Sequence, residues 1–171
     1  MTNGGKSCSI SIGFLYQNKG TQVISISQKC QYALRAVFEL GKRQHEGPTK
    51  IGDIAAVQAI PPRFLELILA ELKQAGIVES RRGPQGGYIL AVPPSELTAN
   101  RVISLVDGPI QPVKCVAVGG ADCPLRGKCS FEQMWKNAGE AIAEVFDSTT
   151  FQDLIDREPA ALAEQSASYC I

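Results

Sequence analysis

Residues 51–92, IGDIAAVQAIPPRFLELILAELKQAGIVESRRGPQGGYILAV, decide the fold. An apolar-rich segment over 51–58 predicts a short helix, and the residues at 59–61 predict a tight turn. Pro62 then begins a second helix, because a proline loses nothing at the first helical position, where the amide hydrogen has no partner. Ala75-Gly76 stops this helix, since glycine readily adopts the positive backbone angles found at helix ends.

A glycine-rich hairpin is expected next. Two β-rich segments, over 77–82 and 88–92, are joined by Gly83-Pro84-Gln85-Gly86-Gly87, which permits a tight hairpin tip. A short helix, a turn, a second helix and a hairpin, in this order, are typical of a winged helix-turn-helix. The same order also fits a helical domain with a surface hairpin, or a winged helix that contacts proteins.

A winged helix that binds DNA places the first residues of its second helix against base edges in the major groove. Its hairpin lies along the minor groove and the phosphates when arginines stand at its base. We therefore expect DNA contacts from the start of the second helix and from the hairpin, namely from Pro61, Pro62, Arg63, Phe64, Glu66, Leu67, Arg81, Arg82, Gly83 and Gln85.

A longer helix is predicted over 28–44, with Ser27 as its cap, because the serine hydroxyl can accept an amide hydrogen of the first turn. Its polar residues Gln31, Arg35, Glu39 and Lys42 form one thin stripe on a helix that is otherwise apolar, which indicates a central, buried helix. Thr49 is expected to cap the following helix. In the helix that begins at Pro62, the apolar spacing points Phe64, Leu65, Ile68, Leu69 and Leu72 inward.

The C-terminal half continues the helical pattern. A helix is expected to start within 95–98 and to end at Asp107-Gly108-Pro109, followed by a loop over 110–130 that has no period. Beyond it the apolar residues alternate spacings of four and three, as in helices that pair with one another: Phe131, Trp135, Ala138, Ile142 and Val145. A short last helix is predicted over 150–157.

These segments predict a mainly α fold with a small β-hairpin: a winged helix-turn-helix DNA-binding domain followed by a long C-terminal dimerisation helix. The expected divisions are a flexible N-terminal extension (1–23), the winged helix-turn-helix (24–94), a connecting helix with a cysteine-bearing loop (95–130), the dimerisation helix with the short last helix (131–158), and a tail (159–171).

Composition excludes several classes of protein. Residues 28–92 hold nine basic and six acidic residues, whereas 93–171 hold six and eleven, which fits a module that faces phosphates joined to one that does not. No apolar run approaches the roughly 20 residues of a membrane-spanning helix, and 1–23 lack the pattern of a signal peptide, so we expect a cytoplasmic protein without membrane contact. There is no nucleotide-binding glycine loop and no nucleophile with a base partner, so we expect no enzyme.

Several motifs together resemble one family, the Rrf2 family of bacterial regulators, over roughly residues 24–157. They are Ile26-Ser27, YALRA at 32–36, Ile54-Ala55, QAIP at 58–61, AGIV at 75–78, RGPQGGY at 82–88 and FDSTT at 146–150. The resemblance implies a homodimer in which the heptad-like helix crosses its partner, and a winged helix that reads a near-palindromic operator in double-stranded DNA. Leu67 stands where some members carry a polar base-reading residue, so base preference does not transfer.

Three cysteines, Cys115, Cys123 and Cys129, lie within fifteen residues of the predicted loop. Cysteines in a chain without a secretion signal favour metal or redox chemistry over disulfides. Thiolates on a flexible loop can hold an iron–sulfur cluster or zinc, and inert thiols are the remaining alternative. The resemblance favours a 2Fe–2S cluster, because cluster-binding members carry three cysteines between the helix after the wing and the dimer helix, although the first spacing is longer here.

Three cysteines leave one coordination site of a cluster open. The resemblance suggests Glu132, which stands where a histidine ligand occurs in some members, or Cys30, which lies near where others supply a ligand from the partner chain. A fourth ligand other than cysteine leaves an iron open to nitric oxide, oxygen or loss. His45 is expected at the surface, and Cys8 and Cys170 are expected to be incidental residues of the tails.

The sequence therefore predicts a homodimeric DNA-binding transcription regulator, such as a repressor, gated by a cluster that senses redox state, nitric oxide or iron–sulfur supply. From its place in the chain, we expect the cysteine loop to touch both the winged helix-turn-helix, which we call the reading head, and the dimer helix. The alternatives are a winged-helix regulator controlled by a partner protein, with idle cysteines, and a zinc-binding regulator.

Overall fold

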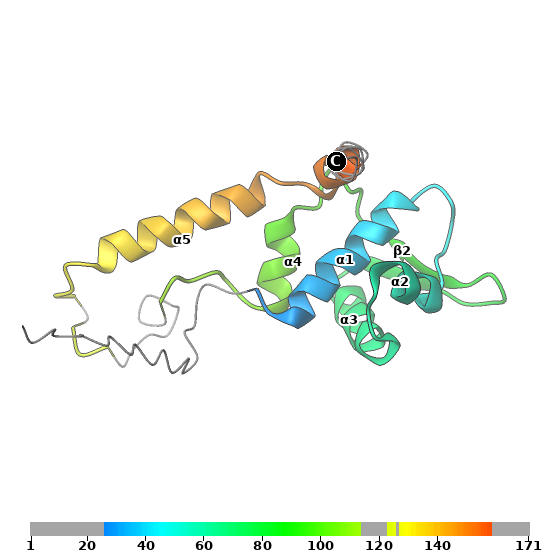
Figure 1. Cartoon of the computed structure of the whole chain (residues 1–171), viewed down its shortest axis with the longest axis horizontal. Coiled ribbons are helices and arrows are strands. Elements are labelled where there is room, and N and C mark those ends of the chain that lie inside the picture. Colours follow the sequence, from blue (N-terminus) through cyan, green and yellow to red (C-terminus); the bar gives the residue numbers. More distant parts are fainter. Residues whose placement is uncertain (1–25, 114–122, 126, 159–171) are drawn as a thin grey trace, which may run out of the picture.

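The structure is a computed structural model that describes residues 26–113, 123–125 and 127–158. It is mainly helical with one antiparallel two-stranded hairpin, as predicted. The elements follow along the chain (Figure 1) as α1 (Gln28–Lys42), α2 (Ile51–Gln58), α3 (Pro62–Gln74), β1 (Val78–Arg81), β2 (Gly87–Leu90), α4 (Ala99–Val106), α5 (Glu132–Asp147) and a helical segment over 151–158.

Helix α1 is the element against which α2, α3, α4 and β2 all pack. Its inner residues are buried in the main core: Ala33, Ala36, Val37 and Leu40. The predicted cap is confirmed, because the Ser27 hydroxyl accepts a hydrogen bond from the amide of Cys30 at 3.1 Å. The helix ends at Lys42, earlier than the predicted residue 44.

One charged residue of α1 is buried. Glu39, which the sequence places in the polar stripe, is only 2% exposed. Its carboxylate accepts hydrogen bonds from Arg43 Nε at 2.6 Å and from Gln58 Nε2 at 2.9 Å. Arg35 donates to the backbone oxygen of Gln58 at 3.2 Å. Helix α1 therefore holds the last residue of α2, immediately before the turn into α3.

The turn between α2 and α3 has a left-handed residue at its centre. Ala59 ends α2 with φ of 51°, an angle that redirects the chain and that residues other than glycine, asparagine and aspartate seldom adopt. The predicted capping of α2 by Thr49 is wrong: α2 follows Lys50 without a side-chain cap. Thr49 instead pairs with Tyr88 in β2, donating at 2.9 Å and accepting at 2.8 Å through its backbone, so it extends the hairpin sheet.

The hairpin strands are shorter than predicted. Val78 lies opposite Leu90 at one end of the ladder, and Arg81 lies opposite Gly87 at the other. Gly87 has no side chain, which leaves room for the backbone of Thr49 against the strand. A wing of three paired segments results, held to the core by the buried Val78 and Leu90.

The segment after α5 returns to the main core. Thr98 and Thr150 form a β-bridge, and the amide of Phe151 donates to the backbone oxygen of Leu97 at 3.0 Å. Phe151 is completely buried. Helix α4 begins at Ala99, capped by Thr98, and residues 94–96 form a turn, so the helix starts just after the predicted 95–98.

We predict that Glu39→Ala lowers the free energy of unfolding by about 2 kcal/mol, because it leaves Gln58 without its partner and Arg43 without its counter-charge. Glu39→Gln should cost less, since an amide oxygen can still accept a hydrogen bond. Urea unfolding measures both, with Glu140→Ala on the exposed face of α5 as the control. A loss for Glu39→Ala as small as that for Glu140→Ala would contradict the assignment.

Candidate functional site

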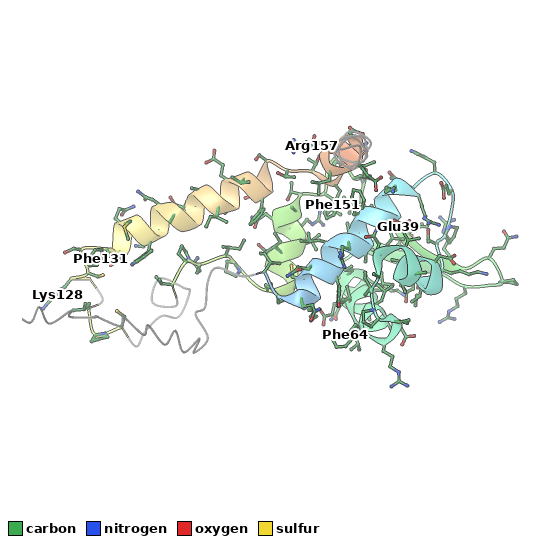
Figure 2. All side chains as sticks on the ribbon, in the orientation of Figure 1. Glu39, Phe64, Lys128, Phe131, Phe151 and Arg157 are labelled. Carbon is green, nitrogen blue, oxygen red and sulfur yellow. The ribbon has the colours of Figure 1, made fainter. Side chains whose placement is uncertain are left out.

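The first turns of α3 present an exposed surface. The stripe of Leu65, Ile68, Leu69 and Leu72 is buried and fixes the rotation of the helix against the core. Phe64 lies at the edge of this stripe and is 55% exposed, so the prediction that it points inward is wrong. Its side chain is accessible to solvent, as a residue predicted to contact DNA must be. Leu67 is 64% exposed, and Arg63 and Glu66 are exposed beside it. Figure 2 shows Phe64 on α3, outside the packed helices.

The remaining predicted DNA-contacting residues are also accessible. Pro61 and Pro62 are exposed at the start of α3, and on the wing Arg81, Arg82, Gly83 and Gln85 are exposed. Among the residues that the structure describes, no ion pair involves Arg63, Arg81 or Arg82. Their positive charges are therefore available to an anionic partner.

Helix α3, the predicted recognition helix, and the wing form one unit. The backbone amide of Ile77 donates to the oxygen of Leu72 at 2.9 Å, and Gly76, with φ of 70°, turns the chain from α3 into β1. Lys73 Nζ donates to Ser80 Oγ at 2.5 Å, which ties the end of α3 to the wing. The structure therefore joins both predicted contact segments through direct contacts between the end of α3 and β1.

Two of the three clustered cysteines lie in the described ranges, and Cys115 lies outside them. Cys123 and Cys129 are partly exposed free thiols. The amide of Glu132 donates to the backbone oxygen of Cys129 at 3.2 Å, so Glu132 begins α5 one turn after that cysteine. Within 26–113, 123–125 and 127–158, no three His, Cys, Asp or Glu side chains gather closely enough to hold a metal.

The part of the cysteine loop next to α5 lies away from α3 and the wing, whereas Ile110, at the start of the predicted loop, packs against the cluster that contains Cys30 of α1. Figure 2 shows Lys128 and Phe131 at the outer end of α5, far from Phe64 on α3. Figure 1 shows α5 extending away from the helices that surround α1, with the wing at the opposite end of the molecule. Within one chain, the part of the loop next to α5 is therefore separated from α3 and the wing by the helices between them.

The two candidate fourth ligands differ sharply. Cys30 is completely buried between α1 and α4, and burial, with a smaller contribution from the Asp107 carboxylate, raises the pKa of its thiol to about 12. A metal ligand must be a thiolate, so the position of Cys30 argues against this role. Glu132 is partly exposed and pairs with Lys136 at 2.7 Å. A carboxylate beside Cys129 on the exposed loop fits the donor set of a cluster better.

Helix α5 carries an uncovered apolar face. Phe131 is 61% exposed and Val145 60%, while Trp135, Ala138 and Ile142 on the same face are half-buried. Another face packs on the chain itself, where the buried Gly139 lies against Pro112. Among the described residues, the two ends of the heptad-like seam are thus left exposed and its middle is only half-covered.

Residues that sequence reasoning missed hold the site in place. The Glu39–Gln58 contact is one, and its only signal is an acidic residue within an otherwise apolar helix. Asp107 is another: its carboxylate accepts from the amide of Ser27 at 2.7 Å and from the Ser27 hydroxyl at 2.5 Å.

His45 is exposed, as expected. No helix in the described ranges is long and apolar enough to cross a membrane.

Comparison with known proteins gives consistent matches. The model of the Rrf2 family, described as iron-dependent transcriptional regulators, matches residues 26–157. The HTH-type transcriptional regulator CymR of Bacillus subtilis is 36% identical over 131 residues, which cover 77% of this chain and 89% of CymR. The HTH-type transcriptional regulator IscR of Aliivibrio salmonicida is 30% identical over 143 residues, covering 83% and 84%.

Solved structures give the same fold. The structure of CymR, described as the global cysteine regulator of B. subtilis, has a TM-score of 0.64 at 36% identity and covers 77% of this chain and 96% of its own. The structure of IscR of T. potens has a TM-score of 0.64 at 32% identity, covering 80% and 90%. These relatives are regulators and not enzymes.

The exposed arginines should have separable roles. We predict that Arg82→Ala weakens binding to every duplex and lowers the steepness of the salt dependence, as for a lost phosphate or minor-groove contact. Arg63→Ala should instead change sequence preference, by about 1–3 kcal/mol per lost base contact. Fluorescence anisotropy on specific and random duplexes at several salt concentrations measures both, with Arg101→Ala on α4 as the control. If Arg63→Ala and Arg82→Ala behave identically on both duplexes, these roles are wrongly assigned.

Proposed function

The chain belongs to the Rrf2 family of transcriptional regulators, and from this premise we propose that it is a homodimeric DNA-binding regulator gated by an iron–sulfur cluster. It is a transcription regulator and not an enzyme. The observation that supports the gating proposal is the sequence cluster of Cys115, Cys123 and Cys129 before α5, in which Cys123 and Cys129 are partly exposed free thiols. A regulator of this kind acts where the chromosome is, in the cytoplasm.

For DNA recognition, the proposal uses the exposed start of α3 and the wing. The N-terminal turns of α3, from Pro61 to Leu67, enter the major groove, where an exposed helix can reach base edges. The wing, with Arg81, Arg82, Gly83 and Gln85, follows the phosphates and the minor groove. Two such heads in a symmetric dimer read a near-palindromic operator.

The dimer forms through α5. An apolar helical face this long is seldom exposed to solvent on a small protein. Packing against the same face of a second copy would bury it in a symmetric dimer. The heptad-like spacing from Phe131 to Val145 fits the packing of one helix against another. The exposed Phe131 and Val145, on a helix that extends away from the other helices (Figure 1), support this arrangement.

We predict that Trp135→Glu yields monomers that bind operator DNA weakly, because it places a charge at the centre of the seam and each half-site alone contributes too little affinity. Size-exclusion chromatography with light scattering measures the mass at micromolar concentration. Glu140→Ala, off the seam on the same helix, should remain dimeric. A monomeric wild-type protein under these conditions would refute the proposed assembly.

The cluster site is assigned to Cys115, Cys123 and Cys129, with Glu132 as the fourth ligand. When bound, a 2Fe–2S group supplies a redox-sensitive centre that oxygen, nitric oxide or iron loss can alter. The chain's own contribution is to hold the thiolates on a partly exposed segment and to offer the carboxylate of Glu132, the first residue of α5, one turn after Cys129. Ligation would fasten the residues between α4 and α5, which set the direction of the dimer helix.

A second candidate function has a specific observation in its favour. The relative at 36% identity is described as a global cysteine regulator, which gives no sign of a metal. In that case a partner protein controls the winged helix, and the cysteines are idle. Zinc bound by the same thiolates is a further alternative, because zinc also prefers cysteine ligands. Metal analysis separates these possibilities.

We predict that anaerobically purified protein is coloured and contains iron and acid-labile sulfide, and that Cys123→Ala loses both while it remains folded and dimeric. Cys30→Ala is the matched control: its thiol is buried in the core and should not change the iron content. Iron and sulfide assays with visible spectroscopy give the readout. Colourless protein with zinc would favour the zinc alternative, and protein with no metal would favour the partner-controlled regulator.

A further inference from the structure

Two large apolar side chains stand on the solvent side of the recognition helix. Phe64 and Leu67 lie one turn apart on α3, and each is more than half exposed. We call this pair the apolar reading patch. Neither side chain has a hydrogen-bond donor or acceptor. Neither can therefore recognise a base by hydrogen bonding to its edge, which is how proteins distinguish most base pairs.

The surroundings of the apolar reading patch indicate what covers it. Arg63 is exposed next to Phe64 on α3, and with Arg81 and Arg82 on the wing it makes no ion pair within the described part of the chain. Uncompensated guanidinium groups beside an apolar patch and on the wing that follows it fit a partner that is strongly anionic overall but carries apolar groups. The major groove of DNA is such a surface, and its apolar group is the C5-methyl of thymine.

We propose that Phe64 and Leu67 read thymine methyl groups, so that each operator half-site carries thymine opposite the first turns of α3. This inference rests on the proposed DNA binding and specifies its sequence preference. Each methyl removed from water against an apolar side chain strengthens binding about fourfold, from the transfer free energy of one such group. Arg63 supplies hydrogen bonds to neighbouring bases, while the apolar reading patch selects thymine by contact alone.

The test uses the full-length dimer and DNA of known sequence. A duplex is recovered by repeated selection from a random library with the wild-type protein, and each thymine is then replaced in turn by deoxyuridine. This exchange removes only the C5-methyl and keeps every hydrogen-bonding group of the base. We expect one or two replacements in each half-site to weaken binding about fourfold each, and the other replacements to have no effect.

Protein variants show whether the patch causes the effect. In Leu67→Ala or Phe64→Ala the sensitivity to deoxyuridine should disappear at the matching position, as a double-mutant cycle requires for direct contact. Leu105→Ala removes an equally apolar, partly exposed side chain from α4 and should retain the full sensitivity. Because the deoxyuridine exchange changes only the DNA, the wild-type comparison does not depend on how any variant folds.

The other outcomes overturn the inference in distinguishable ways. A selected duplex that is bound equally well with deoxyuridine shows that the patch does not contact thymine methyls and points to a protein partner, while DNA binding itself stands. Equal sensitivity in the wild type and in both patch variants shows that the methyl acts through DNA shape. If selection recovers no preferred duplex, sequence-specific DNA binding fails, and the inference fails with it.

Discussion

The burial of α1 is the constraint on which the rest of the structure depends. With Ala33, Val37 and Leu40 in the core, the helix has neighbours on most sides, and its contacts with α2, α3, α4 and β2 fix where each of them lies. A fully buried aliphatic side chain contributes roughly 1.5–3 kcal/mol, so this surface supplies much of the stability of a small domain. The same helix also carries Glu39, whose carboxylate holds α2 just before the turn that aims the recognition helix.

The chain between α4 and Thr150, which contains the cysteine loop and α5, leaves this core and returns to it, and it is anchored at both ends. Where it leaves, Asp107 at the end of α4 holds the cap residue of α1 by two hydrogen bonds. Where it returns, the Thr98–Thr150 bridge and the buried Phe151 fix the chain after α5. Since the part of the loop next to α5 lies far from α3 (Figure 1), the proposed ligation would act on DNA binding through the direction of α5, and so through the spacing of the two winged helices in the dimer. A few kilocalories of difference between two arrangements would suffice to change operator affinity by orders of magnitude.

Local signals in the sequence predicted most of the elements but little of their contacts. Proline, glycine and apolar spacing placed α3 correctly, because these residues act through their own backbone and nearest turn. The prediction failed where a distant segment decides the outcome: Thr49 pairs with β2 instead of capping α2, and Glu39 is buried because Gln58 and Arg43 meet it. Phe64 was placed inward because hydrophobicity alone predicts burial, whereas its side chain lies at the edge of the buried stripe of α3 and is exposed. The cysteine spacing predicted a ligand set, but only packing separates the buried Cys30 from the exposed Glu132.

The proposed control of DNA binding by the cysteine loop can be measured on a single promoter. Binding isotherms on one natural promoter, at fixed salt and under anaerobic conditions, would be measured for the iron-loaded dimer and for the same preparation after its iron is removed. The account predicts that the two affinities differ by tenfold or more, in either direction, while both forms remain dimeric. Equal affinities would contradict it and leave a DNA-binding regulator whose cysteines do not control it.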